Sequence, residues 1–137
     1  MAQLIDTSVF IALERQQLSL DLLEHSFPTG RIALAVITAS ELLAGVYGAD
    51  TEQRRHRRQA LVERILNTLP VITFDLPTAR VYGQLIVDLR KSGQTIGAHD
   101  LQIAATALSG GFEEVTHNVR DFSRVPDLGG SQINPSA

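Results

Sequence analysis

Residues Arg31–Ile37, with the sequence RIALAVI, form the apolar run that decides the fold. Similar short runs lie at Ala2–Ile5 and Pro70–Phe74, and helical patterns separate the three. Strands that are apolar along nearly their whole length are typical of a parallel sheet, because helices cover both faces of such a sheet. The alternation of strands and helices therefore predicts an α/β fold with a mainly parallel central sheet.

The other elements follow from helical periodicity and from turn residues. Helices are expected at about residues 7–17, 18–27, 38–47, 77–91 and 99–108, with an arginine-rich helix ending near residue 69. A short fourth strand is expected at Glu114–Thr116 and an edge strand at Ile133–Pro135. No linker or internal repeat interrupts the 137 residues, so a single domain over 1–137 is predicted.

The composition excludes several classes of protein. The chain has no cysteine, which excludes a disulfide scaffold, a zinc finger and a thiol nucleophile. No apolar run reaches the roughly 18 residues that a membrane helix needs. The N-terminus also lacks the basic and then apolar pattern of a signal peptide. We therefore expect a soluble protein that acts in the cytoplasm.

The formal net charge of −3 hides an uneven distribution of charge along the chain. Residues 51–68 contain five Arg and two Glu, a local balance of +3. Four of these arginines crowd into one short stretch: Arg54, Arg55, Arg57 and Arg58. A guanidinium group binds phosphate, but it binds carboxylates on a partner protein equally well. The cluster is therefore either a contact surface for nucleic acid or protein, or a solvated helix face.

Three acidic residues occupy similar places in the expected topology. Asp6 ends the first strand, and Glu41 lies in the first turn of the helix expected after the second strand. Asp100 lies in the first turn of the alanine-rich helix near residues 99–108. In an open α/β sheet, the carboxyl ends of the strands and the helix starts beyond them form the usual ligand crevice. Acids that are far apart in sequence are thus able to meet there.

Each acid also has a purely structural interpretation. Asp6 and Asp100 suit helix N-termini through capping and the helix dipole, and residues 38–41 match the S/T-x-x-E capping box that would employ Glu41. If the acids instead meet, a ligand set made only of oxygens selects a hard ion, Mg²⁺ or Mn²⁺. Such an ion suits phosphodiester hydrolysis, since it activates water and stabilises developing negative charge. The residues alone leave both interpretations open.

Four segments together resemble a known family. They are LIDTSVFIAL at 4–13, VITASELLAGV at 36–46, IGAHDLQIAATAL at 96–108 and VTHNVRDFSRVPDL at 115–128. In this order they resemble the PIN-domain nucleases, and more narrowly the VapC toxins of bacterial and archaeal toxin–antitoxin pairs. The resemblance implies a three-layer α/β/α sandwich and an acidic pocket that binds Mg²⁺ or Mn²⁺.

The resemblance also implies roles for individual residues. Asp6 and Asp100 match the two aspartates of the family and are implied to be catalytic and the main metal ligands. Glu41 matches the family's glutamate, and is implied to hold the metal through water or to orient the attacking water. Ser8 matches a supporting hydroxyl that positions the carboxylates.

The last motif of the family departs from its usual pattern in this chain. Thr116 and Asn118 are implied to support the carboxylates and the metal-bound water, but Asn118 stands where many members have a fourth acid. Asp121, three residues further on, is an alternative source of that catalytic charge. The choice between Asn118 and Asp121 stays open.

Family members cut transfer, ribosomal or messenger RNA and usually form homodimers. A cognate VapB-type antitoxin inhibits them with a tail in the active-site groove, in heterotetramers or larger complexes, and operator DNA is bound only through that antitoxin. The resemblance therefore implies a Mg²⁺-dependent endoribonuclease without a membrane partner. RNA backbone or antitoxin contacts are then expected at four arginines: Arg54, Arg55, Arg57 and Arg58.

Two other functions that use clustered acids fit the sequence less well. A phosphatase of the haloacid-dehalogenase type needs Asp-x-Asp after the first strand, but Ser8 occupies the second position. A receiver-type domain needs a lysine near a late strand, and the only lysine, Lys91, lies near a helix end. The alternative that stays open is a catalytically weak or inactive PIN fold that binds RNA or antitoxin, which Asn118 favours.

Overall fold

The structure of the protein is a computed structural model, which describes residues 2–16, 18–26, 31–116 and 130–131. Within these residues five strands form one sheet in the order β3-β2-β1-β4-β5. Every neighbouring pair is parallel, so the predicted parallel sheet is confirmed. The strands are β1 (Gln3–Ile5), β2 (Ile32–Ala35), β3 (Val71–Ile72), β4 (Glu113–Val115) and β5 (Gly130–Ser131).

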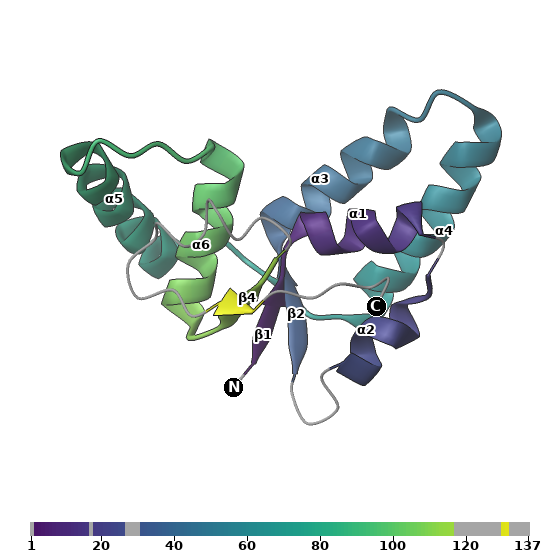
Figure 1. Cartoon of the computed structure of the whole chain (residues 1–137), viewed down its shortest axis with the longest axis horizontal. Helices are drawn as coiled ribbons and strands as arrows, with labels where there is room; N and C mark the ends of the chain where they lie inside the picture. Colours follow the sequence, from purple (N-terminus) through teal and green to yellow (C-terminus); the bar gives the residue numbers. More distant parts are fainter. Residues whose placement is uncertain (1, 17, 27–30, 117–129, 132–137) are drawn as a thin grey trace.

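Helices cover both faces of this sheet, which confirms the three-layer α/β/α sandwich (Figure 1). Helices α5 and α6 lie on one side, and helices α1 to α4 lie on the other (Figure 1). The helices are α1 (Thr7–Arg15), α2 (Leu20–Ser26), α3 (Val36–Tyr47), α4 (Glu52–Thr68), α5 (Leu76–Lys91) and α6 (Ala98–Gly110). Among the residues that the structure describes, no helix is both long enough and apolar enough to span a membrane.

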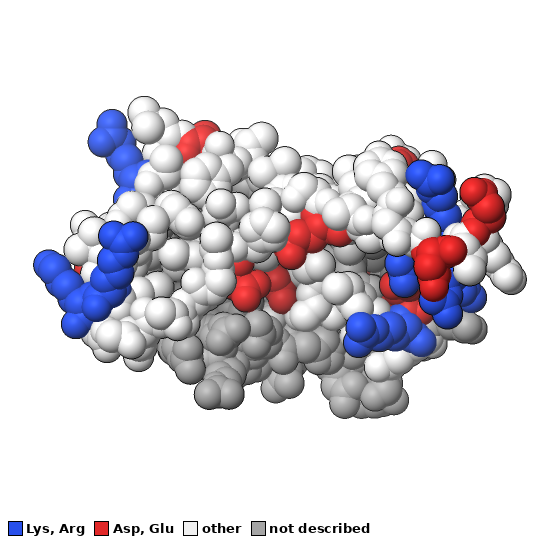
Figure 2. All heavy atoms as spheres, turned by 90° about the horizontal axis from the view of Figure 1, so that it is seen from above, with Lys and Arg blue, Asp and Glu red and all other residues white. Residues whose placement is uncertain are grey.

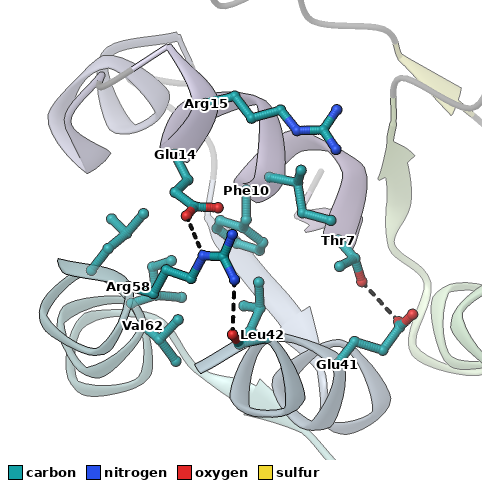
Figure 3. A pocket seen from close by; sticks show the side chains of 12 residues that line it. Thr7, Phe10, Glu14, Arg15, Glu41, Leu42, Arg58 and Val62 are labelled. Carbon is teal, nitrogen blue, oxygen red and sulfur yellow. Dashed lines mark hydrogen bonds and ion pairs between the residues drawn. The ribbon is translucent and has the colours of Figure 1, made fainter. Parts of the chain in front are cut away.

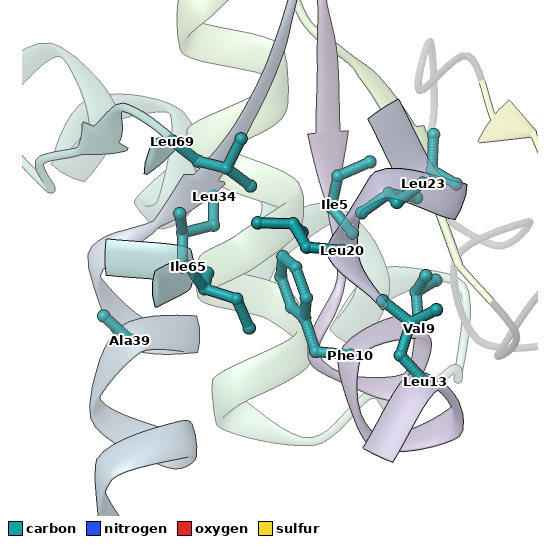
Figure 4. Packing of buried hydrophobic residues seen from close by; sticks show 11 residues of the cluster. Ile5, Val9, Phe10, Leu13, Leu20, Leu23, Leu34, Ala39, Ile65 and Leu69 are labelled. Carbon is teal, nitrogen blue, oxygen red and sulfur yellow. The ribbon is translucent and has the colours of Figure 1, made fainter. Parts of the chain in front are cut away.

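Two hydrophobic clusters hold the layers together, one on each face of the sheet. Successive residues of a strand point to opposite faces, so Leu4 packs against α5 and α6 while Ile5 packs against α1 and α2. The ring of Phe10, from α1, lies near the centre of the second cluster, next to Ile65 of α4 (Figure 4). The apolarity of Leu4, Ile5 and β2 thus follows from burial on both faces.

The boundary between β2 and α3 differs from the prediction. The strand ends at Ala35 and the helix begins at Val36, whereas a strand to Ile37 and a helix from Thr38 were expected. Ala35 is the N-cap and makes no side-chain capping bond, and Thr38 is buried inside the first turn. The predicted capping box is therefore wrong. The apolar run continues unbroken from strand into helix, so no change of periodicity marks the boundary.

The remaining boundaries agree with the predictions to within a few residues. Strand β4 begins and ends one residue earlier than expected, and α6 extends to Gly110, where Gly111 ends it with a left-handed backbone (φ 71°). The short strand β5 lies at the edge of the sheet, at Gly130–Ser131. The edge strand expected at Ile133–Pro135 lies outside the described residues.

Candidate metal centre and its surroundings

Asp6 lies at the carboxyl edge of the sheet, between β1 and α1, and only 3% of it is exposed. Its Oδ2 accepts hydrogen bonds from Ser8 Oγ (2.7 Å), Thr116 Oγ1 (3.0 Å) and the Ser8 amide (3.3 Å). The bond from the amide is an N-cap, so the capping interpretation of Asp6 is correct. All three bonds go to Oδ2, so Oδ1 is the oxygen of this carboxylate that is suited to a second purpose.

Ser8 and Thr116 are brought together around this carboxylate, as the prediction of supporting hydroxyls requires. Their two hydroxyl oxygens lie 3.3 Å apart, although the residues are separated by most of the chain. Thr116 directly follows β4, and the Asp6 amide donates to the carbonyl of Val115 at 2.9 Å. The parallel pairing of β1 with β4 therefore places these groups at one point. Their role toward a metal ion stays a prediction.

Glu41 is held by residues from two other helices. Thr7 Oγ1 donates to Glu41 Oε1 at 2.9 Å, and His99 Nδ1 lies 3.4 Å from Oε2. Because α3 begins five residues earlier, at Val36, Glu41 lies beyond the first turn and does not cap the helix. The sequence prediction missed Thr7, which is buried, although its position directly after Asp6 at the strand-to-helix junction was a signal.

Asp100 lies in the first turn of α6, as expected from the sequence. It does not act as the N-cap, which is Gly97, and its place in the first turn agrees with the macrodipole interpretation. Asp100 follows His99, whose ring contacts Glu41, so α6 brings Asp100 to the same edge of the sheet as Glu41.

Glu114 is an acidic residue of this region that sequence reasoning missed. It lies in β4 opposite Leu4, is fully buried, and within the described residues neither of its carboxyl oxygens has a hydrogen-bond partner. Burial, and then the negative charges of Asp6 and Asp100, raise the pKa of Glu114 well above its ordinary value. An acid inside a short buried strand was the signal, because a charged group is costly there without a partner.

The pKa of Glu114 predicts how stability depends on pH. Because folding raises this pKa, the folded protein binds more protons than the unfolded chain at pH values above the ordinary 4.5. We therefore expect the free energy of unfolding to fall as pH rises through and beyond that value. The melting temperature of Glu114→Gln, measured in EDTA, should exceed that of the wild type by a margin that grows with pH. A margin that stays constant from pH 5 to pH 8 would contradict this.

The acidic residues meet the chemical requirements of a hard divalent ion. Within the described part of the chain, however, no three Asp, Glu or His side chains are close enough together to surround one ion. Nevertheless Asp6 and Asp100 both lie near enough to raise the pKa of Glu114, whose two buried oxygens lack partners among the described residues. An oxygen-only donor set with excess negative charge suits Mg²⁺ or Mn²⁺.

A cavity of about 240 Å³ adjoins this centre, between α1, α3 and α4 (Figure 3). Thr7 and Glu41 line one end of it, and Arg58 lines the other. Arg58 Nε donates to Glu14 Oε1 at 2.6 Å, and Nη1 donates to the carbonyl of Gly45 at 3.1 Å. Arg58 thus ties α4 to both α1 and α3, and the cavity has a polar rim around an apolar base.

The other arginines of the predicted cluster lie further out on α4. Arg54 pairs with Asp50 at 3.1 Å, and Arg55 and Arg57 are exposed. Viewed onto the carboxyl edge of the sheet, acidic side chains lie across the middle, and Lys and Arg lie toward both ends, where further acidic side chains accompany them at the right-hand end (Figure 2). The uneven charge along the sequence is therefore also uneven on the surface. Contact of these arginines with RNA or antitoxin stays a prediction.

Two predicted residues lie outside the described residues: Asn118 and Asp121. Their place in the catalytic site, including the choice between them for a fourth acidic position, stays a prediction.

Comparison with known proteins agrees with the fold. The chain matches the PIN domain over residues 4–128. It superimposes on the crystal structure of VapBC2 from Rickettsia felis bound to a promoter DNA fragment, with a TM-score of 0.87 and 26% identity, covering 98% of this chain and 100% of that chain. The chain belongs to the PIN domain family.

Its relatives place it more narrowly, among the VapC proteins. Ribonuclease VapC1 from Rickettsia felis is 37% identical over 128 residues, which are 93% of this chain and 93% of that protein. The tRNA(fMet)-specific endonuclease VapC from Salmonella typhimurium is 35% identical over 100 residues, covering 73% of this chain and 74% of that protein.

Proposed function

We propose that this protein is a metal-dependent endoribonuclease, the toxin of a VapBC-type toxin–antitoxin pair. The observation that carries the proposal is the place of three acidic residues from separate elements at the carboxyl edge of the sheet: Asp6 is buried where β1 meets α1, and Asp100 lies in the first turn of α6, next to the His99 that contacts Glu41. Relatives named as ribonucleases support RNA as the substrate.

Asp6, Asp100 and Glu41 would hold the ion, which we propose to be Mg²⁺, with Mn²⁺ as a substitute. When bound, the ion lowers the pKa of water and stabilises charge that develops on the phosphate. Glu41 is suited to orient the attacking water, because Thr7 donates a hydrogen bond to one of its oxygens and His99, from a different helix, lies 3.4 Å from the other. Such fixed orientation removes an entropic part of the barrier.

Ser8 and Thr116 contribute by holding Asp6 rather than by reacting. Both hydroxyls bond to Oδ2 of Asp6, which keeps the carboxylate in one orientation. Residues that orient metal ligands in this way typically contribute roughly 10- to 100-fold to metal affinity or activity.

The partners of the protein follow from the same family. We propose that a VapB-type antitoxin inhibits it, that the toxin forms a homodimer, and that toxin and antitoxin assemble into heterotetramers or larger complexes in the cytoplasm. Structural neighbours solved as VapBC complexes, including one bound to promoter DNA, support this proposal. Contact with operator DNA is proposed only through the antitoxin.

Incubation of the purified protein with total RNA tests the proposed function. Cleavage is expected with Mg²⁺ and is expected to disappear with EDTA, because the acids need the cation to activate water and to offset their own charge. Restoration by excess Mn²⁺ is also expected. Cleavage that persists unchanged in EDTA would overturn the metal mechanism, and RNA retention without cleavage under any condition would favour the alternative of a binding module.

A further inference from the structure

Glu114 has a place in the structure that packing does not explain. Fully buried carboxyl groups are rare unless they are paired or hydrogen-bonded. Among the described residues Glu114 has no hydrogen-bond partner, although it lies in the strand next to β1. Its neighbour across the strands is Leu4, which is part of the hydrophobic cluster against α5 and α6. The carboxyl therefore weakens the folded state without a compensating contact in this part of the chain.

The register of the strands shows which way Glu114 faces. Residues paired across a sheet point to the same face, so Glu114 and Leu4 both face α6. The backbone of Asp6 is still extended, with φ −76° and ψ 154°, so Asp6 faces the same side as Leu4. Glu114 thus lies about two residues, or roughly 7 Å along the strand, below the position of Asp6.

The third acid lies on the helix that covers this face. Asp100 is in the first turn of α6, and Leu101 and Ile103 of the same helix pack in the cluster with Leu4. Glu114 is therefore enclosed between β1, β4 and α6, beneath Asp6 and Asp100. The negative charges of those two residues, after burial itself, raise the pKa of Glu114, as this placement requires.

We propose that Glu114 is a further carboxyl of the divalent-cation site, which faces the ion from the sheet side, beneath Asp6 and Asp100. This inference rests on the proposed metal-dependent function and deepens it. A divalent ion between these groups offsets three mutually repelling carboxyls and satisfies oxygens that otherwise lack partners among the described residues. It also gives this chain an acid at the site that does not depend on Asn118 or Asp121.

Direct measurement of Mn²⁺ binding tests the inference without an activity assay. The wild type, Glu114→Gln and Glu113→Gln are stripped of metal and titrated with Mn²⁺, and free Mn²⁺ is followed by electron paramagnetic resonance. Glutamine has the shape of glutamate without its charge. Glu113 is the matched control, because it is the preceding residue of β4 and faces the other side of the sheet.

We expect Glu114→Gln to raise the dissociation constant for Mn²⁺ at least about tenfold, and Glu113→Gln to leave it within twofold of the wild type. Melting curves of the metal-free proteins verify that both variants are folded. If Glu114→Gln binds Mn²⁺ as tightly as the wild type does, the inference is wrong while the proposed function stands. If the wild type itself binds no Mn²⁺ at millimolar concentrations, both are wrong.

Discussion

Replacement of Asp6 by Asn is expected to reduce the rate of RNA cleavage about 1,000-fold, equivalent to roughly 4 kcal/mol of transition-state stabilisation. The amide oxygen of Asn is still able to accept from Ser8 and Thr116, so the hydrogen bonds to Oδ2 have a substitute. The negative charge that would bind the ion is lost. The large effect is therefore expected on catalysis and not on folding.

Initial rates of cleavage of total RNA, at saturating Mg²⁺, measure this effect. Asp88→Asn is the matched control, because Asp88 lies on α5 and its described partner is Gln84, four residues earlier on the same helix. The control should retain wild-type activity, and both variants should show cooperative melting. Retention of more than a tenth of the wild-type rate by Asp6→Asn would show that Asp6 is not a principal metal ligand.

Replacement of Phe10 by Ala is expected to lower the free energy of unfolding by about 3–5 kcal/mol. Phe10 is 1% exposed, and its ring fills the space between α1, α4 and the sheet (Figure 4). Removal of the ring leaves a cavity that the surrounding side chains of three elements cannot fill without moving. Since a domain of this kind is stable by only about 5–15 kcal/mol, much of the total would be lost.

Urea denaturation followed by circular dichroism measures this difference in stability. Ile11→Ala is the control from the same helix. Because Ile11 is 37% exposed, its replacement removes less buried apolar surface than the replacement of Phe10 does. We expect the control to lose less than about 1 kcal/mol. A loss of similar size in both variants would mean that Phe10 does not have the central place in the packing that Figure 4 shows.

Much of the fold could be predicted because its strands are buried on both faces. When helices separate apolar runs such as Arg31–Ile37, a strand covered on both sides is the structure that suits them best, and the parallel order follows. The apolarity of the run is also the reason why the start of α3 at Val36 could not be predicted. A strand without alternation passes directly into a helix that begins with apolar residues, so Val36 and Ile37 suit either element equally well.

The candidate site could be predicted only where residues lie at the ends of elements. Asp6 and Asp100 follow a strand or begin a helix, and topology brings such positions to one edge. Glu114 lies inside a strand, where the sequence shows that an acid is unusual but not which groups surround it. Thr7 and His99 contact Glu41 through tertiary packing of three helices, which the local sequence does not reveal.

The contacts of Glu41 have a consequence for how activity depends on folding. Thr7 belongs to α1 on one side of the sheet, whereas His99 belongs to α6 on the other, and both contact the same carboxylate. Partial opening of either helical layer would release one oxygen of Glu41 before the rest of the chain unfolds. Activity is thus a sensitive reporter of native structure, and mild denaturant should inactivate the protein before its bulk helical signal changes.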